Sequence, residues 1–171
     1  ALLISTERYA SGQEDNLAHG VVTLDGSEGL SVQYASCCKP IPGDRIVGYL
    51  GRGEGLVVHG EDCVVARRLR ARDAERFLEV EWADEPTRPF DTTVVVTVTN
   101  GKGVLARVAA SIAAAEGDIT HVDMGDEPAQ TATDIRFSVA VRDRQHLADV
   151  LRSLKRTPSV IKAQRFKPAK A

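Results

Sequence analysis

Two adjacent cysteines, Cys37 and Cys38, begin the segment that most constrains how this chain can fold. A proline-rich run, 39–44, follows them, and His59 and Cys63 come soon after. Three thiols and one imidazole are the ligand set of a closed structural zinc site. The stretch between Cys38 and His59 is long enough for a hairpin that would bring the two pairs of residues together. We therefore predict a metal site at these four residues, with zinc as the ion.

Other interpretations of the cysteines remain open. Zinc modules usually separate their first two cysteines by about two to four residues, whereas Cys37 and Cys38 are neighbours and need a sharp backbone turn to share an ion. Free cysteine is among the most buried residue types, so all three could instead be small core residues in a tight turn. A disulfide between Cys37 and Cys38 is disfavoured, because its ring would be strained.

The composition is that of an ordinary globular protein. Hydrophobic residues make up 43% of the 171 residues and charged residues 27%. No apolar run is long enough to span a membrane, so no membrane partner is expected. An odd number of cysteines, 3, disfavours a secreted disulfide scaffold and favours the reducing cytoplasm. The net charge of −2 gives no global indication of nucleic-acid binding.

Basic residues nevertheless gather in two places. A short predicted helix at 62–72 is rich in arginine, and the segment 151–171 contains no acidic residue. Clusters of this kind either bind RNA phosphates or simply form a solvated face. The candidate RNA contacts are Arg67, Arg68, Arg70, Arg152, Lys155 and Arg156.

Turn signals and alternating apolar residues divide the first half of the chain. We predict a linker or fragment end at 1–19 and a small β-rich domain at 20–83, in which the cysteines lie. The first two strands are expected to pair across the Asp25-Gly26 turn, and the next two to form a hairpin around the glycine-rich loop 51–55. The core of such a domain is thin, so a metal would help to hold it together. The predicted strands are 20–24, 30–34, 46–50, 56–59 and 77–82, and the predicted helix is 62–72.

The second half has a clearer pattern. A linker with two prolines, 84–89, leads to a domain at 90–167, and 168–171 form a tail. The elements follow the order β-α-β-β-α-β of the ferredoxin-like fold, so we predict the α+β class for the whole chain. Gly117 is expected to cap the first helix and Asp143 the second. The predicted strands are 92–99, 119–124, 132–141 and 160–166, with helices at 104–115 and between Asp143 and Pro158, and a turn at 126–130.

These features resemble a known family. The run Cys-Cys-Lys-Pro-Ile-Pro-Gly-Asp at 37–44, followed by Gly53-Glu54-Gly55, His59 and Cys63, resembles the cysteine-rich, zinc-finger-like domain of long RelA/SpoT-type stringent-response proteins. Residues 90–167 resemble the ACT domain that ends those proteins. The resemblance implies that the chain is the C-terminal regulatory region of an enzyme that makes or hydrolyses guanosine tetra- and pentaphosphate, (p)ppGpp.

The resemblance also implies what such a region does. In the family this end adjusts the balance between the catalytic domains of the parent protein, and in some members it contacts the ribosome and its RNA. Related ACT domains bind amino acids, branched-chain ones in part of the family, in pockets that often lie between paired protomers and so imply a homodimer. No motif here resembles a catalytic domain, so we expect the chain by itself not to be an enzyme. A cysteine-dependent enzyme, with His59 as its base, is a remote alternative.

The candidate effector site is the loop before the helix predicted to start at Val104. The N-terminus of a helix offers unpaired amides to a carboxylate, and glycines let a ligand approach the backbone closely. An apolar ligand side chain would lie against Val104, Leu105 and the next strand. The alternatives are a loop that only turns the chain, and a His121 that is a partly exposed packing residue. The candidate effector-binding residues are Asn100, Gly101, Lys102, Gly103, Val104, Leu105, Ile119 and His121.

Overall fold

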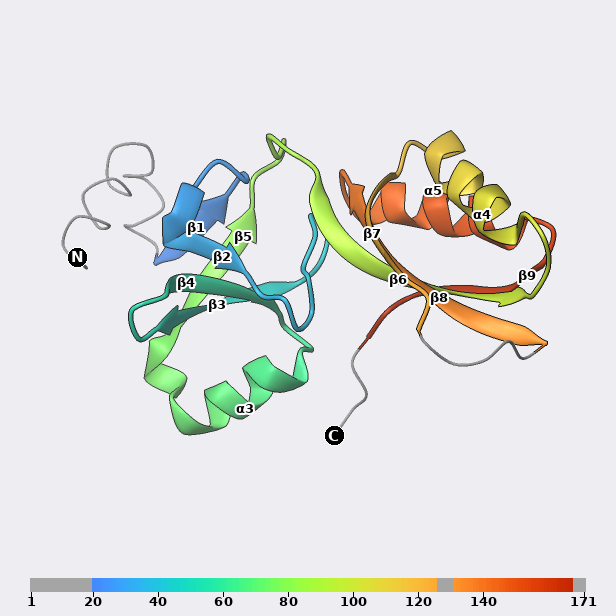
Figure 1. Ribbon diagram of the computed structural model, residues 1–171. Coiled ribbons are helices and arrows are strands. Elements are labelled where there is room, and N and C mark those ends of the chain that lie inside the picture. Colours follow the sequence, from blue (N-terminus) through green and yellow to red (C-terminus); the bar gives the residue numbers. More distant parts are fainter. Residues whose placement is uncertain (1–19, 126–130, 168–171) are drawn as a thin grey trace. The chain divides into compact units, whose positions relative to one another are not determined.

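The computed structural model describes residues 20–125 and 131–167, which Figure 1 shows in colour. These residues form two compact units whose boundary lies between Arg88 and Pro89. The predicted linker at 1–19, the turn at 126–130 and the tail at 168–171 lie outside the described residues. No helix in the described ranges is long and apolar enough to cross a membrane.

The first unit is a five-stranded sheet with the strand order β1-β5-β3-β4-β2. The predicted hairpin of the third and fourth strands is confirmed, because β3 and β4 pair antiparallel. The predicted pairing of the first two strands is wrong: β1 pairs in parallel with β5, and β2 in parallel with β4, at opposite edges of the sheet. The elements are β1 (Val21–Leu24), a 3-10 turn (Gly29–Ser31), β2 (Val32–Tyr34), β3 (Ile46–Gly51), β4 (Gly55–Gly60), α3 (Val64–Arg72), a second 3-10 turn (Ala74–Arg76) and β5 (Phe77–Trp82).

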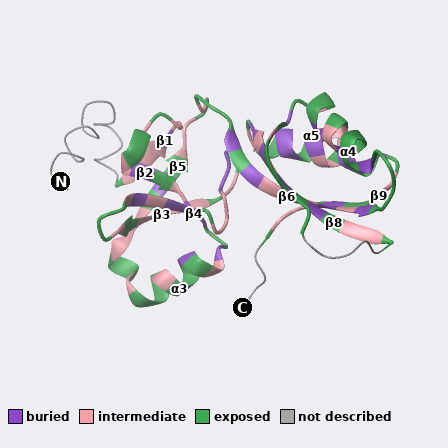
Figure 2. Ribbon diagram, viewed as in Figure 1, coloured by how far each residue is buried: buried purple, intermediate pink, exposed green. Residues whose placement is uncertain are grey.

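The separation of β1 from β2 follows from what each strand buries. The segment between them contains a 3-10 turn and not a tight two-residue turn, so it carries the chain to the other edge of the sheet. Each edge strand then contributes to one apolar cluster, which consists of Leu24, Val32, Leu56, Val58 and Val80. Figure 2 shows these buried positions in purple, within a unit whose other residues are mostly half-buried or exposed. The core of the first unit is therefore small, as predicted.

Residues of the predicted linker 84–89 bind to the first unit. The N–H and the hydroxyl of Thr87 both donate to the carbonyl of Asp25, at 2.7 and 3.0 Å. The Arg88 Nε donates to the carbonyl of Gly26 at 2.9 Å, and its guanidinium lies 5.4 Å from the centre of the Tyr34 ring. The segment up to Arg88 is thus held against the turn that follows β1.

The second unit has the predicted order β-α-β-β-α-β, with the strands arranged as β7-β8-β6-β9. Both helices lie on one side of this sheet in Figure 1. Alternate residues of the two long central strands are buried, which gives a continuous core. The predicted α+β fold class is therefore confirmed. The elements are β6 (Phe90–Thr99), α4 (Val104–Ala114), β7 (Asp118–Asp123), β8 (Ala132–Val141), α5 (Arg144–Lys155) and β9 (Val160–Arg165).

The sequence predicted a capping residue at the start of α5 and another at the end of α4. The Asp143 carboxylate accepts a hydrogen bond from the His146 N–H at 2.8 Å, which confirms the predicted N-cap of α5. After α4 the left-handed residue is Glu116, with φ of 62°, and not the predicted Gly117. Gly117 is needed instead for space, because a Cβ there would lie 2.8 Å from Ile112 Cγ2.

Candidate metal centre and effector loop

A single helical turn allows the two adjacent cysteines to point to one place. The Lys39 N–H donates to the carbonyl of Ala35 at 2.9 Å, so the turn encloses Cys37 and Cys38. Lys39 itself has a positive φ of 43°, which ends the turn immediately before Pro40. This is the sharp backbone turn that two neighbouring ligands require.

The other two members of the cluster come from the end of β4 and the start of α3. His59 is the second-to-last residue of β4, and Cys63 is the N-cap residue of α3. The Cys63 N–H donates to the carbonyl of Gly60 at 3.1 Å, and the Gly60 N–H donates to Cys38 Sγ at 3.3 Å. The turn between β4 and α3 is thereby joined to the cysteine turn.

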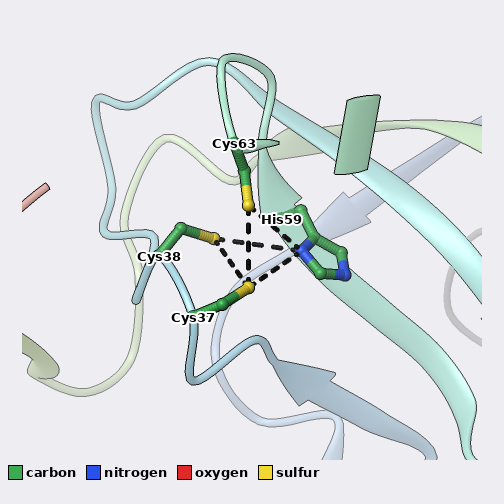
Figure 3. Close-up of side chains that lie close together, drawn as sticks. All are labelled: Cys37, Cys38, His59 and Cys63. Carbon is green, nitrogen blue, oxygen red and sulfur yellow. Dashed lines mark hydrogen bonds between the residues drawn. The ribbon is translucent and has the colours of Figure 1, made fainter. Parts of the chain in front are cut away.

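The four side chains converge, as Figure 3 shows. Cys37 Sγ lies 3.6 Å from Cys63 Sγ and 4.0 Å from Cys38 Sγ. His59 presents Nδ1, which lies 3.5 Å from the sulfur of Cys37, 4.0 Å from that of Cys38 and 3.8 Å from that of Cys63. All four ligand atoms lie within 4.8 Å of one another. The residues predicted to share a metal are thus brought together.

These distances match those of a tetrahedral zinc site. Zinc–sulfur bonds of about 2.3 Å and zinc–nitrogen bonds of about 2.0–2.1 Å place sulfurs about 3.8 Å apart and sulfur about 3.6 Å from nitrogen. The ligand atoms are close enough together to surround one ion. All three cysteines are free, and Cys37 and Cys38 are half-buried, whereas Cys63 is buried. The cluster could therefore hold a metal ion, and its donor set fits zinc.

The local environment affects the protonation of these groups. Burial raises the pKa of the Cys37 thiol, and the Cys63 thiol adds to that shift. Burial also raises the pKa of Cys38 well above its usual range, against the effect of the Gly60 N–H. Burial lowers the pKa of His59. Without an ion all three groups therefore favour their neutral forms, whereas a dication among them would favour the thiolates.

The candidate effector loop lies before α4, where Gly103 is the N-cap residue with φ of 74°. No side chain caps the helix, so the N-terminal amides of α4 are not satisfied by a capping group. Gly101, Lys102 and Gly103 are exposed. Asn100 instead accepts a hydrogen bond from the Thr133 hydroxyl at 2.8 Å, which ties the end of β6 to β8.

Arg107 also belongs to this loop, although the sequence analysis did not select it. Its guanidinium donates to the carbonyl of Lys102 at 3.3 Å and to the Ser159 hydroxyl at 3.4 Å. Its Nη1 would lie 3.3 Å from a Cβ placed on Gly103. In the sequence, Arg107 is distinguished only by lying one helical turn after Gly103. Many surface arginines lie one turn into a helix, so this position alone does not indicate a role.

The strand after α4 places its two predicted effector residues on opposite faces of the sheet. Ile119 pairs with the buried Val139, on the face that the helices cover. A bulge follows, and His121 pairs with Ser138, the next residue along β8, so it lies on the other face. Val104 is buried, whereas Leu105 is 39% exposed. The register places Ile119 level with Thr92 of β6 and His121 level with Thr93, whereas the loop follows Thr99 at the other end of that strand. Within one copy of the chain, Leu105 therefore lies next to the loop, and Ile119 and His121 do not.

The six basic candidates lie in two units. Arg67, Arg68 and Arg70 are exposed on α3, where the Arg70 guanidinium lies 5.4 Å from the centre of the Phe77 ring. The other three lie at the end of α5 and just beyond it, and all are exposed. Arg152 forms an ion pair with Asp149, whereas Lys155 and Arg156 form no ion pair with the described residues.

Two family models match this chain in succession. The RelA/SpoT RIS domain matches residues 22–83, and the ACT domain matches residues 86–165. The first match contains the cysteine and histidine cluster, and the second contains the glycine loop and the β-α-β-β-α-β unit.

Similar proteins span nearly all of the chain. The bifunctional (p)ppGpp synthase/hydrolase SpoT of Escherichia coli K12 is 33% identical over 150 residues, which cover 86% of this chain and 21% of that protein. The GTP pyrophosphokinase of the same strain is 30% identical over 148 residues, covering 86% of this chain and 20% of its own length. A crystal structure of the ACT domain from the GTP pyrophosphokinase of Chlorobium tepidum covers 46% of this chain and 99% of that domain, with a TM-score of 0.40 and 12% identity.

The chain thus combines a RIS domain with an ACT domain, and it spans about a fifth of the length of the relatives it matches. It belongs to the RelA/SpoT family, as the C-terminal regulatory region of such a protein. The resemblance predicted from the cysteine run and the ACT pattern is confirmed.

Proposed function

We propose that this chain regulates a parent protein that makes or hydrolyses (p)ppGpp, and that its ACT domain senses a branched-chain amino acid. The observation that carries the proposal is Gly103, which holds a left-handed conformation at the uncapped N-terminus of α4. A carboxylate would accept hydrogen bonds from the N-terminal amides of α4, where the Val104 N–H makes a long hydrogen bond of 3.5 Å to the Gly101 carbonyl. Binding would then be relayed to the catalytic domains of the parent protein.

The surroundings of the loop favour an amino acid of this kind. The Arg107 guanidinium beside Lys102 adds positive charge where the carboxylate would lie. The half-exposed Leu105, in the first turn of α4, offers apolar surface for a branched side chain. Both features lie in the second unit and need no residue of the first.

Calorimetry with valine, isoleucine and leucine tests the proposal, using the chain and its Gly103→Val variant. We expect heat of binding for at least one amino acid, and its loss in Gly103→Val, because a β-branched residue is strained at positive φ. Gly53→Val is the matched control: Gly53 has φ of 84° in the other unit, with no neighbouring atom within 4 Å of its added Cβ. It should bind normally. No heat and no thermal shift with any of the three amino acids would refute sensing by this chain.

The relay to the catalytic domains needs the whole parent protein. We expect the amino acid that binds the ACT domain to change (p)ppGpp synthesis or hydrolysis by the parent, and Gly103→Val to abolish that change. An unchanged response in the variant would show that the relay does not start at this loop.

The edge position of β7 supports pairing of two ACT domains. β7 is an outer strand of its sheet; Val122 within it is 37% exposed, and Met124 directly after it is 47% exposed. A second copy would cover these side chains and pair with the open edge. Sedimentation of the chain with and without the bound amino acid tests this, and a monomer under both conditions would argue against it.

We also propose that the cluster of Cys37, Cys38, His59 and Cys63 holds a structural zinc ion. The convergence of four donor atoms at zinc-like separations supports it. Such an ion would fix the turn at 35–39 to the start of α3 and would supply stability that the small core lacks. Elemental analysis of protein purified without chelator should find one equivalent of zinc, and Cys37→Ser should lose it. Protein purified without chelator that contains no metal, although its first unit including α3 is ordered, would refute the site.

Docking to ribosomal RNA is the second function that an observation favours. Arg67, Arg68 and Arg70 are exposed on one short helix, with the aromatic ring of Phe77 beside them. Phosphate contacts of this kind weaken steeply with salt. Binding to ribosomes that falls with rising salt and with Arg67→Ala would support docking, whereas binding independent of both would contradict it.

A further inference from the structure

The helix α3 buries few of its own side chains. Of its 9 residues, all of them described, Ala66 alone is buried. Four arginines, Arg67, Arg68, Arg70 and Arg72, are exposed on it. An isolated helix shorter than about 12–15 residues is marginal in water, so α3 must be stabilised by contacts at its ends or its buried side.

The start of α3 is held through a residue of the metal centre. Cys63 is the N-cap residue, its carbonyl accepts the Arg67 N–H at 3.0 Å, and its thiol points into the cluster. No side chain caps the helix. The other end has the contact of Arg70 with the Phe77 ring, which at an exposed site contributes only about 0.5–1 kcal/mol. Beyond its first turn, α3 is also attached by the buried Ala66 and, through the 3-10 turn that follows it, by Arg76, whose Nη1 donates to the carbonyl of Leu50 at 2.9 Å. The first turn is thus the attachment of α3 that depends on the metal centre.

We propose that the metal centre tethers α3, and that metal occupancy decides whether the four arginines form an ordered surface for the phosphates of an RNA. Ligation by Cys63 joins the first turn of α3 to His59 on β4. It also joins that turn to Cys37 and Cys38, which precede β3 in the sequence. When the ion is lost the sheet keeps its own core, whereas α3 loses this attachment. This inference rests on the proposed zinc site and on the proposed docking to RNA.

Hydrogen exchange on the whole 171-residue chain tests the tether. We compare the zinc-loaded chain, the same chain after chelation, and the variants Cys37→Ser and Cys63→Ser. Amides of α3 should exchange at least ~10-fold faster after chelation and in both variants, while those of β3 and β4 keep more of their protection. Val65→Ala is the control, because Val65 is 40% exposed on α3 and is no ligand. It should keep its zinc and its protection.

The two cysteine variants separate a tether from simple capping. Serine is a better N-cap than cysteine, so if capping held the helix, Cys63→Ser would stabilise α3 and Cys37→Ser would leave it unchanged. A tether predicts the opposite, which is that both variants release α3, although Cys37 does not touch it. Unchanged protection of α3 after chelation would overturn the proposal. So would an equal loss of protection across α3, β3 and β4, because the ion would then hold the whole unit.

Binding to a short RNA hairpin at several salt concentrations tests the consequence. We expect chelation to weaken binding by at least ~10-fold and to reduce its salt dependence, because the arginines no longer act as one array. If the zinc-loaded chain does not bind the RNA, the docking proposal fails, and the surface part of this inference fails with it. Hydrogen exchange then decides the tether alone. If RNA binds equally well with and without the ion, docking stands and metal control of it is overturned.

Discussion

The two units of this chain reach an ordered structure by different physical routes. The ACT unit has two long central strands whose alternate residues are fully buried under two helices. The RIS unit has an apolar cluster of five buried residues. It also has a group of three cysteines and one histidine, which come from separate segments of the chain. The comparison teaches that a periodic pattern can specify the first kind of domain, whereas the second depends on a few long-range links.

The largest expected effect is in the core of the ACT unit. Phe137 is 0% exposed and lies on the helix-covered face of β8. Phe137→Ala should lower the free energy of unfolding of this unit by about 3–5 kcal/mol, through lost apolar contacts and the cavity left behind. Calorimetric melting of the zinc-loaded chain checks this, with the transition of the RIS unit as internal reference. If both transitions fall together, the two units do not keep separate stabilities.

The second prediction concerns the RIS unit alone. Removing zinc should destabilise it by about 2.7 kcal/mol if free zinc was present at about 100 times its dissociation constant, because the ion binds only the folded unit. The ACT unit has no such cluster among its described residues and should melt unchanged. Melting with and without chelator, followed by addition of zinc, measures both. A chelator that lowers the melting temperature of the ACT unit instead would reverse the comparison.

The same contrast explains how much of the fold the sequence predicts. The apolar period locates every strand and helix of both units to within a few residues. It does not predict partners, because alternation shows which side of a strand is buried and not which strand lies beside it. The β1 and β2 strands were therefore paired wrongly, and only the structure shows each beside a parallel partner.

The candidate sites divide in a similar way. The four residues of the candidate metal centre were predicted from their chemistry, because three thiols and one imidazole are the ligand set of a structural zinc site. The candidate effector loop was proposed from its glycines and stays a prediction, but Arg107 beside it was missed because an exposed arginine on a helix has no distinguishing signal. His121 was grouped with Ile119 because they are two residues apart on one strand. The bulge between them, which no residue pattern indicated, puts them on opposite faces.

The third prediction compares a tightly packed glycine in each unit. A Cβ at Gly117 would lie 2.8 Å from Ile112 Cγ2 and 3.2 Å from the Ile112 carbonyl oxygen, which is backbone and cannot move away. A Cβ at Gly48 would lie 2.8 Å from Leu56 Cδ1 and 2.9 Å from Val80 Cγ1, which are side-chain atoms, and 3.4 Å from its nearest backbone neighbour, the Leu78 carbonyl oxygen. Overpacking lowers the free energy of unfolding by about 1–3 kcal/mol. We expect the loss in Gly117→Ala to lie near the upper end of this range and the loss in Gly48→Ala near the lower end.

Chemical denaturation of the two glycine variants, each read from its own unit, checks this ranking. A larger loss for Gly48→Ala would mean that the thin RIS core is packed as rigidly as the ACT core. The two units would then differ only in the number of buried residues, and not in how easily the buried side chains move to accommodate an added methyl group.

The smallest expected effect compares the N-terminal ends of two helices. In α5 the Asp143 carboxylate accepts a hydrogen bond from the His146 N–H at 2.8 Å, whereas α3 has Cys63, a proposed metal ligand, at this position and no capping side chain. Asp143→Ala should therefore cost about 1 kcal/mol, the usual loss of a helix cap, and Asp143→Ser should restore most of it. Unlike the cysteine variants at α3, it should leave α5 ordered, because four residues of α5, among them Leu147 and Leu154, are buried against the sheet side. Hydrogen exchange along α5 measures this. Release of the whole helix in Asp143→Ala would show that α5, like α3, depends on its first turn, and the contrast between a packed helix and a tethered one would be lost.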